Sequence, residues 1–324
     1  MFRLSRVRLG AALAVVLAAA PTSRAAEADK LVPADAEMVV SINVRQVLDS
    51  EVVKKYALEQ IKQFLQGQDA KKFLEDVGLD PLKDVDRVVL GFSGKDQNDI
   101  KGLMIIHGKF DPEKLYKTAE SYTKKDPDKF ALVKDGKDVM FKFQPDNGNP
   151  FYGTVVDGNT VIIGTDKKII TTALAAANGT KKPAIDKKLG ALITKMDDKA
   201  SVWVAMVVNG RFDNAKIPGN QQKFQDQLAN VDTISVVVRV ATDVNVDVTL
   251  GMKDEASAQE MGTAVDDVIV QIKGFAPLLA ANDPKMKPLA DAAQSLKSSV
   301  KDRNVIITAK VPGSAIGQLL NPDQ

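Results

Sequence analysis

Alternating apolar and polar positions predict β-strands through much of the chain. From Val244 to Met252 every second residue is apolar, and Asn, Asp, Thr and Gly stand between them. This period of two is typical of a strand with one buried face. Segments 88–90, 103–106 and 234–240 have the same strand character. Asp-Gly turns at Asp135-Gly136 and Asp157-Gly158 predict hairpins, because both residue types tolerate the positive φ angles of tight turns.

A period close to 3.6 predicts helices between these strands. Apolar residues recur at helical spacing in 49–65, 254–273 and 289–300. Asp111, just before Pro112, and Asp166 should each cap the start of a further helix. Asp69 and Gly78 should begin and end a short one. Hairpins separated by blocks of helix predict an α+β fold, with antiparallel sheets and helices packed on one face.

The same pattern of strands and helices occurs twice, in the same order. Four pairs of segments resemble each other: 35–44 and 198–207, 85–90 and 231–236, 106–111 and 250–254, and 159–163 and 304–308. The second half differs by its helical pattern at 284–300, where the first half has the hairpin at 134–137. We therefore expect two related α+β halves, 26–178 and 186–324, joined by a linker at 179–185. The alternative is that strands and turns of unrelated segments simply look alike.

The first 25 residues have the features of a secretory signal peptide. Arg3, Arg6 and Arg8 form a cationic start, an apolar run follows from Leu9 to Ala20, and small residues stand at Ser23 and Ala25. The apolar run is shorter than the roughly 18–20 residues that a membrane-spanning helix requires. We predict that residues 1–25 are removed and that the mature chain, with no transmembrane segment, is periplasmic or extracellular.

Composition narrows the classes of function that the mature chain could have. Four arginines leave with the signal peptide, so the formal charge falls from +2 to about −2. With no concentrated basic patch beside aromatic residues, we expect no nucleic-acid partner. The chain has no cysteine, which excludes disulfides, thiol catalysis and thiolate metal sites. Its stability must come from a packed core.

Two short motifs resemble segments of exported bacterial proteins. Leu31-Val-Pro-Ala-Asp35 leads into an apolar strand, and Gly78-Leu-Asp-Pro81 leads to Asp84-Val-Asp86-Arg-Val. Together they resemble exported proteins of planctomycete-like bacteria that have no defined activity, and the likeness covers mainly residues 31–110. The resemblance implies an envelope or secreted protein and assigns no functional residue.

Residues that could carry chemistry have simpler structural interpretations. His107 is the only histidine, which favours a structural or surface role over a general base or a metal ligand. Gly91–Lys95 lacks the spacing of a phosphate-binding loop and is expected to end a strand. Asp146–Asn149 lacks the ordered ligands of a calcium loop and is expected to be a turn. The single tryptophan, Trp203, stands in an apolar run and is expected in the core.

Carboxylate pairs are frequent, and a hydrolase could use two of them across a cleft. Capping and solubility explain them better, because each pair stands in a predicted turn or helix, where aspartate is common. The pairs are Asp84 with Asp86, Asp126 with Asp128, Asp197 with Asp198, and Asp266 with Asp267. We identify no catalytic, metal-binding or cofactor-binding residue, and expect no cofactor.

The sequence favours an exported, non-enzymatic binding or structural protein of the cell envelope. Its partner would be a protein or an envelope polymer, bound by a sheet face or by a groove between the halves. A hydrolase using carboxylates alone and a carrier of an apolar ligand are the alternatives. Two inward-facing carboxylates would favour the hydrolase, a large apolar cavity the carrier, and a filled core with an exposed apolar patch the binding protein.

Overall fold

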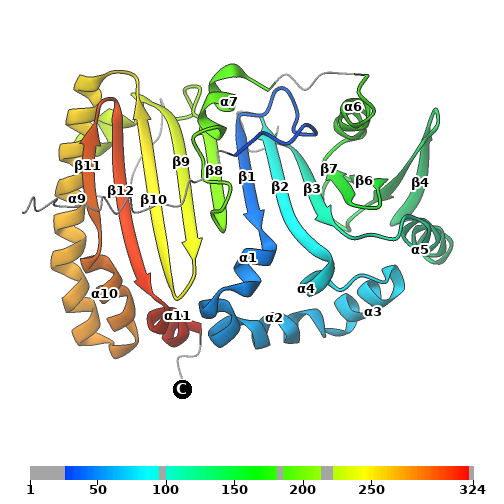
Figure 1. Ribbon diagram of the computed structural model, residues 1–324, viewed down its shortest axis with the longest axis horizontal. Coiled ribbons are helices and arrows are strands. Elements are labelled where there is room, and N and C mark those ends of the chain that lie inside the picture. Colours follow the sequence, from blue (N-terminus) through cyan, green and yellow to red (C-terminus); the bar gives the residue numbers. More distant parts are fainter. Residues whose placement is uncertain (1–25, 95–99, 181–184, 213–221, 321–324) are drawn as a thin grey trace, which may run out of the picture.

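The computed structural model describes residues 26–94, 100–180, 185–212 and 222–320 (Figure 1). Within these ranges, twelve strands form one sheet in the order β11-β12-β10-β9-β8-β1-β2-β3-β7-β6-β5-β4, and every neighbouring pair is antiparallel. The strands are β1 Met38–Asn43, β2 Val85–Ser93, β3 Lys101–Gly108, β4 Phe130–Asp135, β5 Asp138–Phe143, β6 Phe151–Asp157, β7 Thr160–Gly164, β8 Val202–Val207, β9 Val231–Val240, β10 Asp243–Met252, β11 Lys297–Lys301 and β12 Asn304–Pro312.

Helices fill the connections, so the α+β class and the antiparallel sheet predicted from the pattern are confirmed. The helices are α1 Val44–Asp49, η1 Val53–Ala57, α2 Leu58–Leu65, α3 Gln68–Val77, α4 Pro81–Asp84, α5 Pro112–Lys125, α6 Lys167–Ala177, α7 Lys187–Ile193, α8 Gln222–Leu228, α9 Glu255–Asn282, η3 Pro284–Met286, α10 Lys287–Gln294 and α11 Gly313–Leu320. None of the helices in the described ranges is both long and apolar enough to span a bilayer.

Most predicted helix ends are confirmed. Asp111 accepts a hydrogen bond from the Lys114 N–H at the start of α5, and Asp166 accepts one from the Ile169 N–H at the start of α6. Gly78 ends α3 in the left-handed conformation, with φ 69°, which glycine adopts without steric cost.

Three helix boundaries differ from the prediction. The residue that caps α3 is Gly67, not Asp69. α9 continues past Lys273 to Asn282, because the Leu- and Ala-rich segment after Lys273 keeps a helical pattern. The helix predicted through Val300 ends at Gln294, and β11 follows it. Residues 297–301 form a strand because β12 offers them a hydrogen-bonding edge, a tertiary partner that local spacing does not reveal.

The two sequence halves meet at the pairing of β1 with β8. Outward from this junction the order is β1-β2-β3-β7 on one side and β8-β9-β10-β12 on the other. The four pairs of similar segments therefore belong to strands in corresponding places. A common origin of the halves stays a prediction, and the linker expected at 179–185 lies largely outside the described residues.

One face of the sheet, the covered face, is packed against helices and the segment that begins at Ala26. Val39, Ile105 and Ile162 on this face are fully buried, and they belong to one core cluster with Ile170 of α6 and Leu189 of α7. Trp203 is 3% exposed in the same cluster, so its expected place in the core is confirmed.

The opposite face, the open face, carries α5 at one end and α9 at the other (Figure 1). Successive residues of a strand point to opposite faces, so Ile163 of β7 points away from its buried neighbour Ile162. Ile163 lines a cavity together with residues of α5. At the far end, Met261 and Val265 of α9 belong to a second core cluster. Between α5 and α9 the apolar side chains of the open face stay half-buried or exposed.

Candidate ligand-binding site

A cavity of about 540 Å³ lies between α3, α5 and strands β4 to β7, and we call it the aromatic groove. Its volume falls within the roughly 300–1,000 Å³ that is typical of small-molecule sites. The lining residues are predominantly apolar and aromatic: Phe73, Val77, Leu115, Thr118, Ala119, Tyr122, Phe130, Phe141, Lys142, Phe143, Phe151, Tyr152, Gly153 and Ile163.

Four aromatic rings form a connected series along the groove. The ring centroids of Phe73 and Tyr122 are 6.3 Å apart, those of Tyr122 and Phe130 are 5.2 Å apart, and those of Phe130 and Phe143 are 5.2 Å apart. These are the separations of favourable aromatic pairs. Phe73 is 49% exposed, Phe143 is 40% exposed and Phe151 is 43% exposed. The series is therefore accessible at both of its ends.

α5 faces the groove because of its residue spacing. Leu115 and Tyr122 each stand three or four positions from Thr118 and Ala119, so the four residues share one side of the helix. The strands contribute Phe141 and Phe143, which stand two positions apart on β5 and therefore share one face of the sheet. Tyr116, one residue beyond Leu115, meets Phe141 edge to face at 5.1 Å. Helix spacing and strand alternation thus bring apolar side chains together from segments distant in sequence.

Two hydroxyl groups of the groove, those of Thr118 and Tyr122, are occupied by bonds between its own walls. The Thr118 hydroxyl donates to the Asp76 carbonyl at 2.8 Å, and the Tyr122 hydroxyl donates to the Asp76 carboxylate at 2.9 Å. Burial, followed by the hydrogen bond to Asp76 and its negative charge, raises the pKa of Tyr122. The tyrosine therefore stays a neutral donor that holds α3 to α5. The surface that the groove offers to a ligand is therefore mainly hydrocarbon and ring surface.

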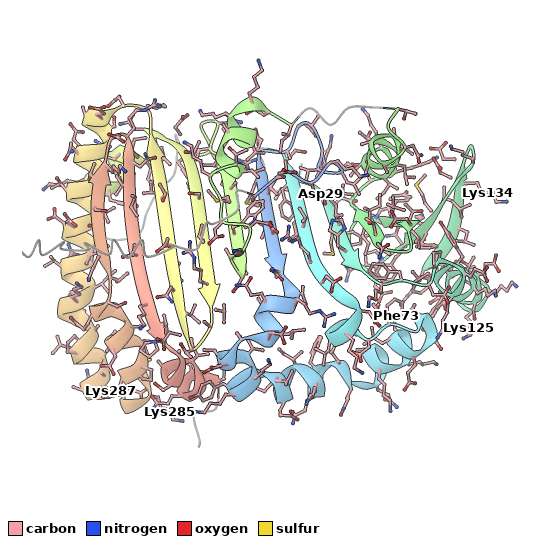
Figure 2. The ribbon with its side chains drawn as sticks, in the orientation of Figure 1. Asp29, Phe73, Lys125, Lys134, Lys285 and Lys287 are labelled. Atoms are coloured by element: carbon pink, nitrogen blue, oxygen red, sulfur yellow. The ribbon has the colours of Figure 1, made fainter. Side chains whose placement is uncertain are left out.

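A lysine ammonium group lies beside one wall of the groove. Lys125, the last residue of α5, places its Nζ 5.5 Å from the centroid of the Tyr122 ring. A cation at this distance is attracted to the electron-rich face of the ring. Figure 2 labels Lys125 and Phe73 at the same end of the molecule. Lys125 is exposed and could meet the polar end of a ligand at this opening.

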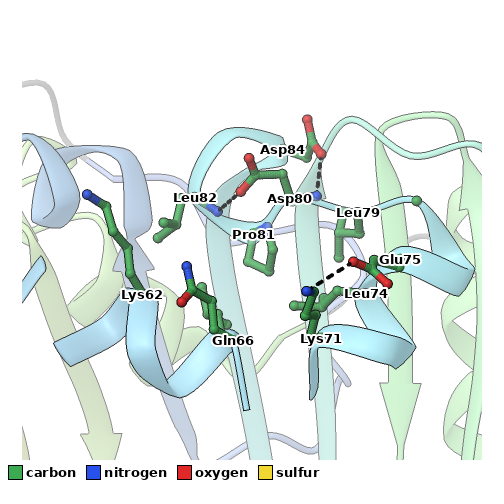
Figure 3. A pocket seen from close by; sticks show the side chains of 12 residues that line it. Lys62, Gln66, Lys71, Leu74, Glu75, Leu79, Asp80, Pro81, Leu82 and Asp84 are labelled. Atoms are coloured by element: carbon green, nitrogen blue, oxygen red, sulfur yellow. Dashed lines mark hydrogen bonds and ion pairs between the residues drawn. The ribbon is translucent and has the colours of Figure 1, made fainter. Parts of the chain in front are cut away.

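A second cavity, of about 430 Å³, lies on the other side of α3 (Figure 3). Asp80 and Asp84 line it, but both serve the local turn: Asp80 accepts from the Leu82 N–H at 3.1 Å, and Asp84 accepts from the Asp80 N–H at 2.7 Å. The hydrogen bond from Lys83 is the largest influence that lowers the pKa of Asp80. A catalytic acid needs a raised pKa, and Asp80 therefore does not have the electrostatics of one.

The other carboxylate pairs are engaged in ion pairs or hydrogen bonds on the protein surface. Asp126 accepts from the Lys129 N–H, while Asp128 lies exposed beside it. Ion pairs join Asp86 to Arg45, Asp197 to Arg239, Asp198 to Arg87 and Asp267 to Lys223, and Asp266 accepts from the Ser298 hydroxyl. None of these carboxylates lines the aromatic groove.

His107 ties the N-terminal segment to β3. Its Nε2 lies 2.6 Å from Asp29 Oδ2, and both side chains border a cavity of only about 90 Å³. The remaining predicted segments have local roles. Asp146, in the turn between β5 and β6, forms an ion pair with Lys129, which precedes β4. Gly91 to Ser93 are the last residues of β2. Within the described ranges, no group of three or more acidic or histidine side chains could hold a metal ion.

A further apolar groove, of about 420 Å³, lies between α9 and α10. Near it, Val270 is 69% exposed, Phe275 is 63% exposed and Leu278 is 59% exposed. This groove has less aromatic character than the first, because Phe275 is the single ring in its lining.

The sequence reasoning missed the aromatic groove. The available signal was the concentration of phenylalanine at 130, 141, 143 and 151 around two predicted hairpins. Alternation showed that Phe141 and Phe143 share a strand face, but not that α3 and α5 would leave a cavity over that face.

Comparisons with known proteins leave the function open. No family model matches the chain. No curated protein sequence matches it. Among solved structures, crystal form I of TP0453 is similar to this chain, with a TM-score of 0.48 and 8% sequence identity over 92% of this chain and 98% of that one. A likeness this distant supports no argument about what the chain does.

Proposed function

We propose that this protein is an exported, non-enzymatic binding protein of the cell envelope that holds an apolar ligand in the aromatic groove. The observation that carries the proposal is the groove itself, a cavity of about 540 Å³ whose rings are accessible and whose Thr118 and Tyr122 hydroxyls are already bonded. This joins the binding role favoured by the sequence with the alternative of an apolar-ligand carrier.

Affinity would come from removing hydrocarbon and ring surface from water. Burial contributes about 25 cal/mol for each Å² of apolar surface. Phe73 and Phe143 would each lose much of their present exposure, 49% and 40%, when a ligand covers them. Because the groove offers few hydrogen-bonding groups, its selectivity should depend on shape and apolar area.

The groove supports binding in preference to hydrolysis. A hydrolase that uses two carboxylates needs them across one cleft, with one pKa raised. The aromatic groove is lined by no carboxylate, and in the cavity on the other side of α3 the pKa of Asp80 is lowered, not raised. An exported carrier also agrees with the signal-like first 25 residues and with a core that needs no disulfide.

Titration of the full chain with the neutral fluorescent probe N-phenyl-1-naphthylamine tests the proposal. We expect saturable binding that the double variant Phe73→Ala, Phe143→Ala weakens about tenfold or more, a loss of about 1.4 kcal/mol. Phe64→Ala is the matched control, because Phe64 is 77% exposed on α2 and lies outside the groove. Circular dichroism should show all variants folded. Non-saturable fluorescence, or equal affinity in the double variant and the control, would reject the groove as the site.

A further inference from the structure

The open face continues the apolar lining of the aromatic groove across the sheet. Ile163 lines the groove, and its cross-strand neighbour on β3 is Met104. Met104 is paired in turn with Leu90, and Leu90 with Val40. From β4 to β12 the complete row of neighbours is Leu132, Phe141, Gly153, Ile163, Met104, Leu90, Val40, Val204, Val236, Val248 and Ile307.

A second row runs beside the first, two residues along each strand and therefore on the same face. Its members are also all apolar: Val161, Ile106, Val88, Ile42, Val202, Val238, Val246 and Ala309. In an antiparallel sheet with one face exposed to water, the side chains on the exposed face are normally polar. Here the face carries apolar side chains while Met104 is 37% exposed and Ile163 is 36% exposed.

We propose that the ligand is a long-chain lipid amphiphile whose hydrocarbon chain runs from the aromatic groove onto the open face. This inference rests on the proposed function and names its ligand class. From Phe141 to Val204 the first row crosses six strand spacings of about 4.8 Å, or about 29 Å. One leaflet of a bilayer is about 15 Å of hydrocarbon thick. A lipid chain of that length that begins at Phe141 would therefore cross about three strand spacings and end near Met104 on β3.

A hydrocarbon chain fits this face better than a protein partner does. Protein interfaces contain about one hydrogen bond for each 100–200 Å². The central strands have neighbours on both sides, so their backbone groups are already paired, and neither row offers a polar side chain. The polar end of the amphiphile would lie at the opening beside Lys125, whose ammonium group suits an anionic head.

Displacement of N-phenyl-1-naphthylamine by two lipid series tests the inference. Fatty acids and lysophospholipids of about eight to eighteen carbons would be compared on the full chain. Each added methylene that is buried should strengthen binding about fourfold, equivalent to about 0.8 kcal/mol. We expect this gain to continue to the longest chains. Met104→Glu should keep the affinity for the shortest chains and lose the gain for longer ones.

Leu319→Glu is the matched control, because Leu319 is 39% exposed on α11 and lies outside both rows and both apolar grooves. Met104→Gln provides a milder variant if Met104→Glu does not fold. The inference would be overturned if short chains bind, longer chains of either series bind no more tightly, and Met104→Glu has no effect. The aromatic groove would then remain as the site. Failure of every lipid and of the probe to bind would instead reject the proposed function.

Discussion

At the scale of single residues, the Asp29–His107 pair joins the start of the described chain to the centre of the sheet. Burial alone would raise the pKa of Asp29. Hydrogen bonds from His107 and the Leu31 N–H, with the charges of His107 and Lys30, outweigh that effect and lower it. The Asp29 side chain is only 15% exposed, so its interactions are weakly screened by solvent.

We predict that Asp29 contributes to acid stability. A carboxyl group whose folded pKa is depressed stabilises the protein above its unfolded pKa, and this contribution is lost as the pH falls below about 4. Asp29→Asn should lower the free energy of unfolding at neutral pH by about 1.5–3 kcal/mol, the scale of a hydrogen bond to a charged group. Urea unfolding from pH 7 down to pH 3 would measure this. Wild type and variant should converge at acid pH, and a constant difference would contradict the prediction.

At the scale of elements, glycine allows α9 to lie close to β11. A Cβ atom added at Gly262 would collide with the side chain of Val300. Gly274, three turns further along the same helix, has nothing within 4 Å of such an atom. The two glycines therefore separate the effect of packing from that of helix propensity within one element.

We predict opposite effects of alanine at these two positions. Gly262→Ala should destabilise the protein by about 1–3 kcal/mol, because the short, β-branched Val300 cannot move aside without shifting β11. Gly274→Ala should stabilise it by up to about 1 kcal/mol, because alanine is the better helix former. Thermal and urea unfolding would measure both. Equal effects of the two substitutions would show that the approach of α9 to β11 is not tightly packed.

At the scale of the whole molecule, each half has a groove beside its long helix on the open face. In the first half, strands β4 and β5 with their phenylalanines form the wall opposite α5. In the second half, α10 stands opposite α9. The β4–β5 hairpin follows α5 and precedes β6, the neighbour of β7. In the same way, α10 follows α9 and precedes β11, the neighbour of β12. The hairpin thus gives the first half the more aromatic groove.

Export is the prediction that concerns the whole chain. The cationic start, the short apolar run and the small residues before Ala26 predict removal of residues 1–25. N-terminal sequencing of protein recovered outside the cytoplasm should begin at Ala26 or Glu27. Recovery of a soluble cytoplasmic form with an intact Met1 would contradict it.

The sequence by itself determined the fold class, most element positions and the order of similar segments. Strand alternation, Asp-Gly turns and the caps at Asp111 and Asp166 are local, because each depends on neighbours within a few residues. The burial of Trp203 also followed from its apolar surroundings. These features needed no knowledge of the tertiary contacts.

Only the tertiary structure decided where the candidate site lies. Residues 297–301 became a strand because β12 lay open to pairing. Phe73, Tyr122 and Phe143 came together because α3 packs against α5 and α5 packs over the β4–β5 hairpin. The apolar rows of the open face depend on the register between strands far apart in sequence. Periodicity shows which side of an element is apolar, but only packing determines whether that side is filled by the protein or left open to a ligand.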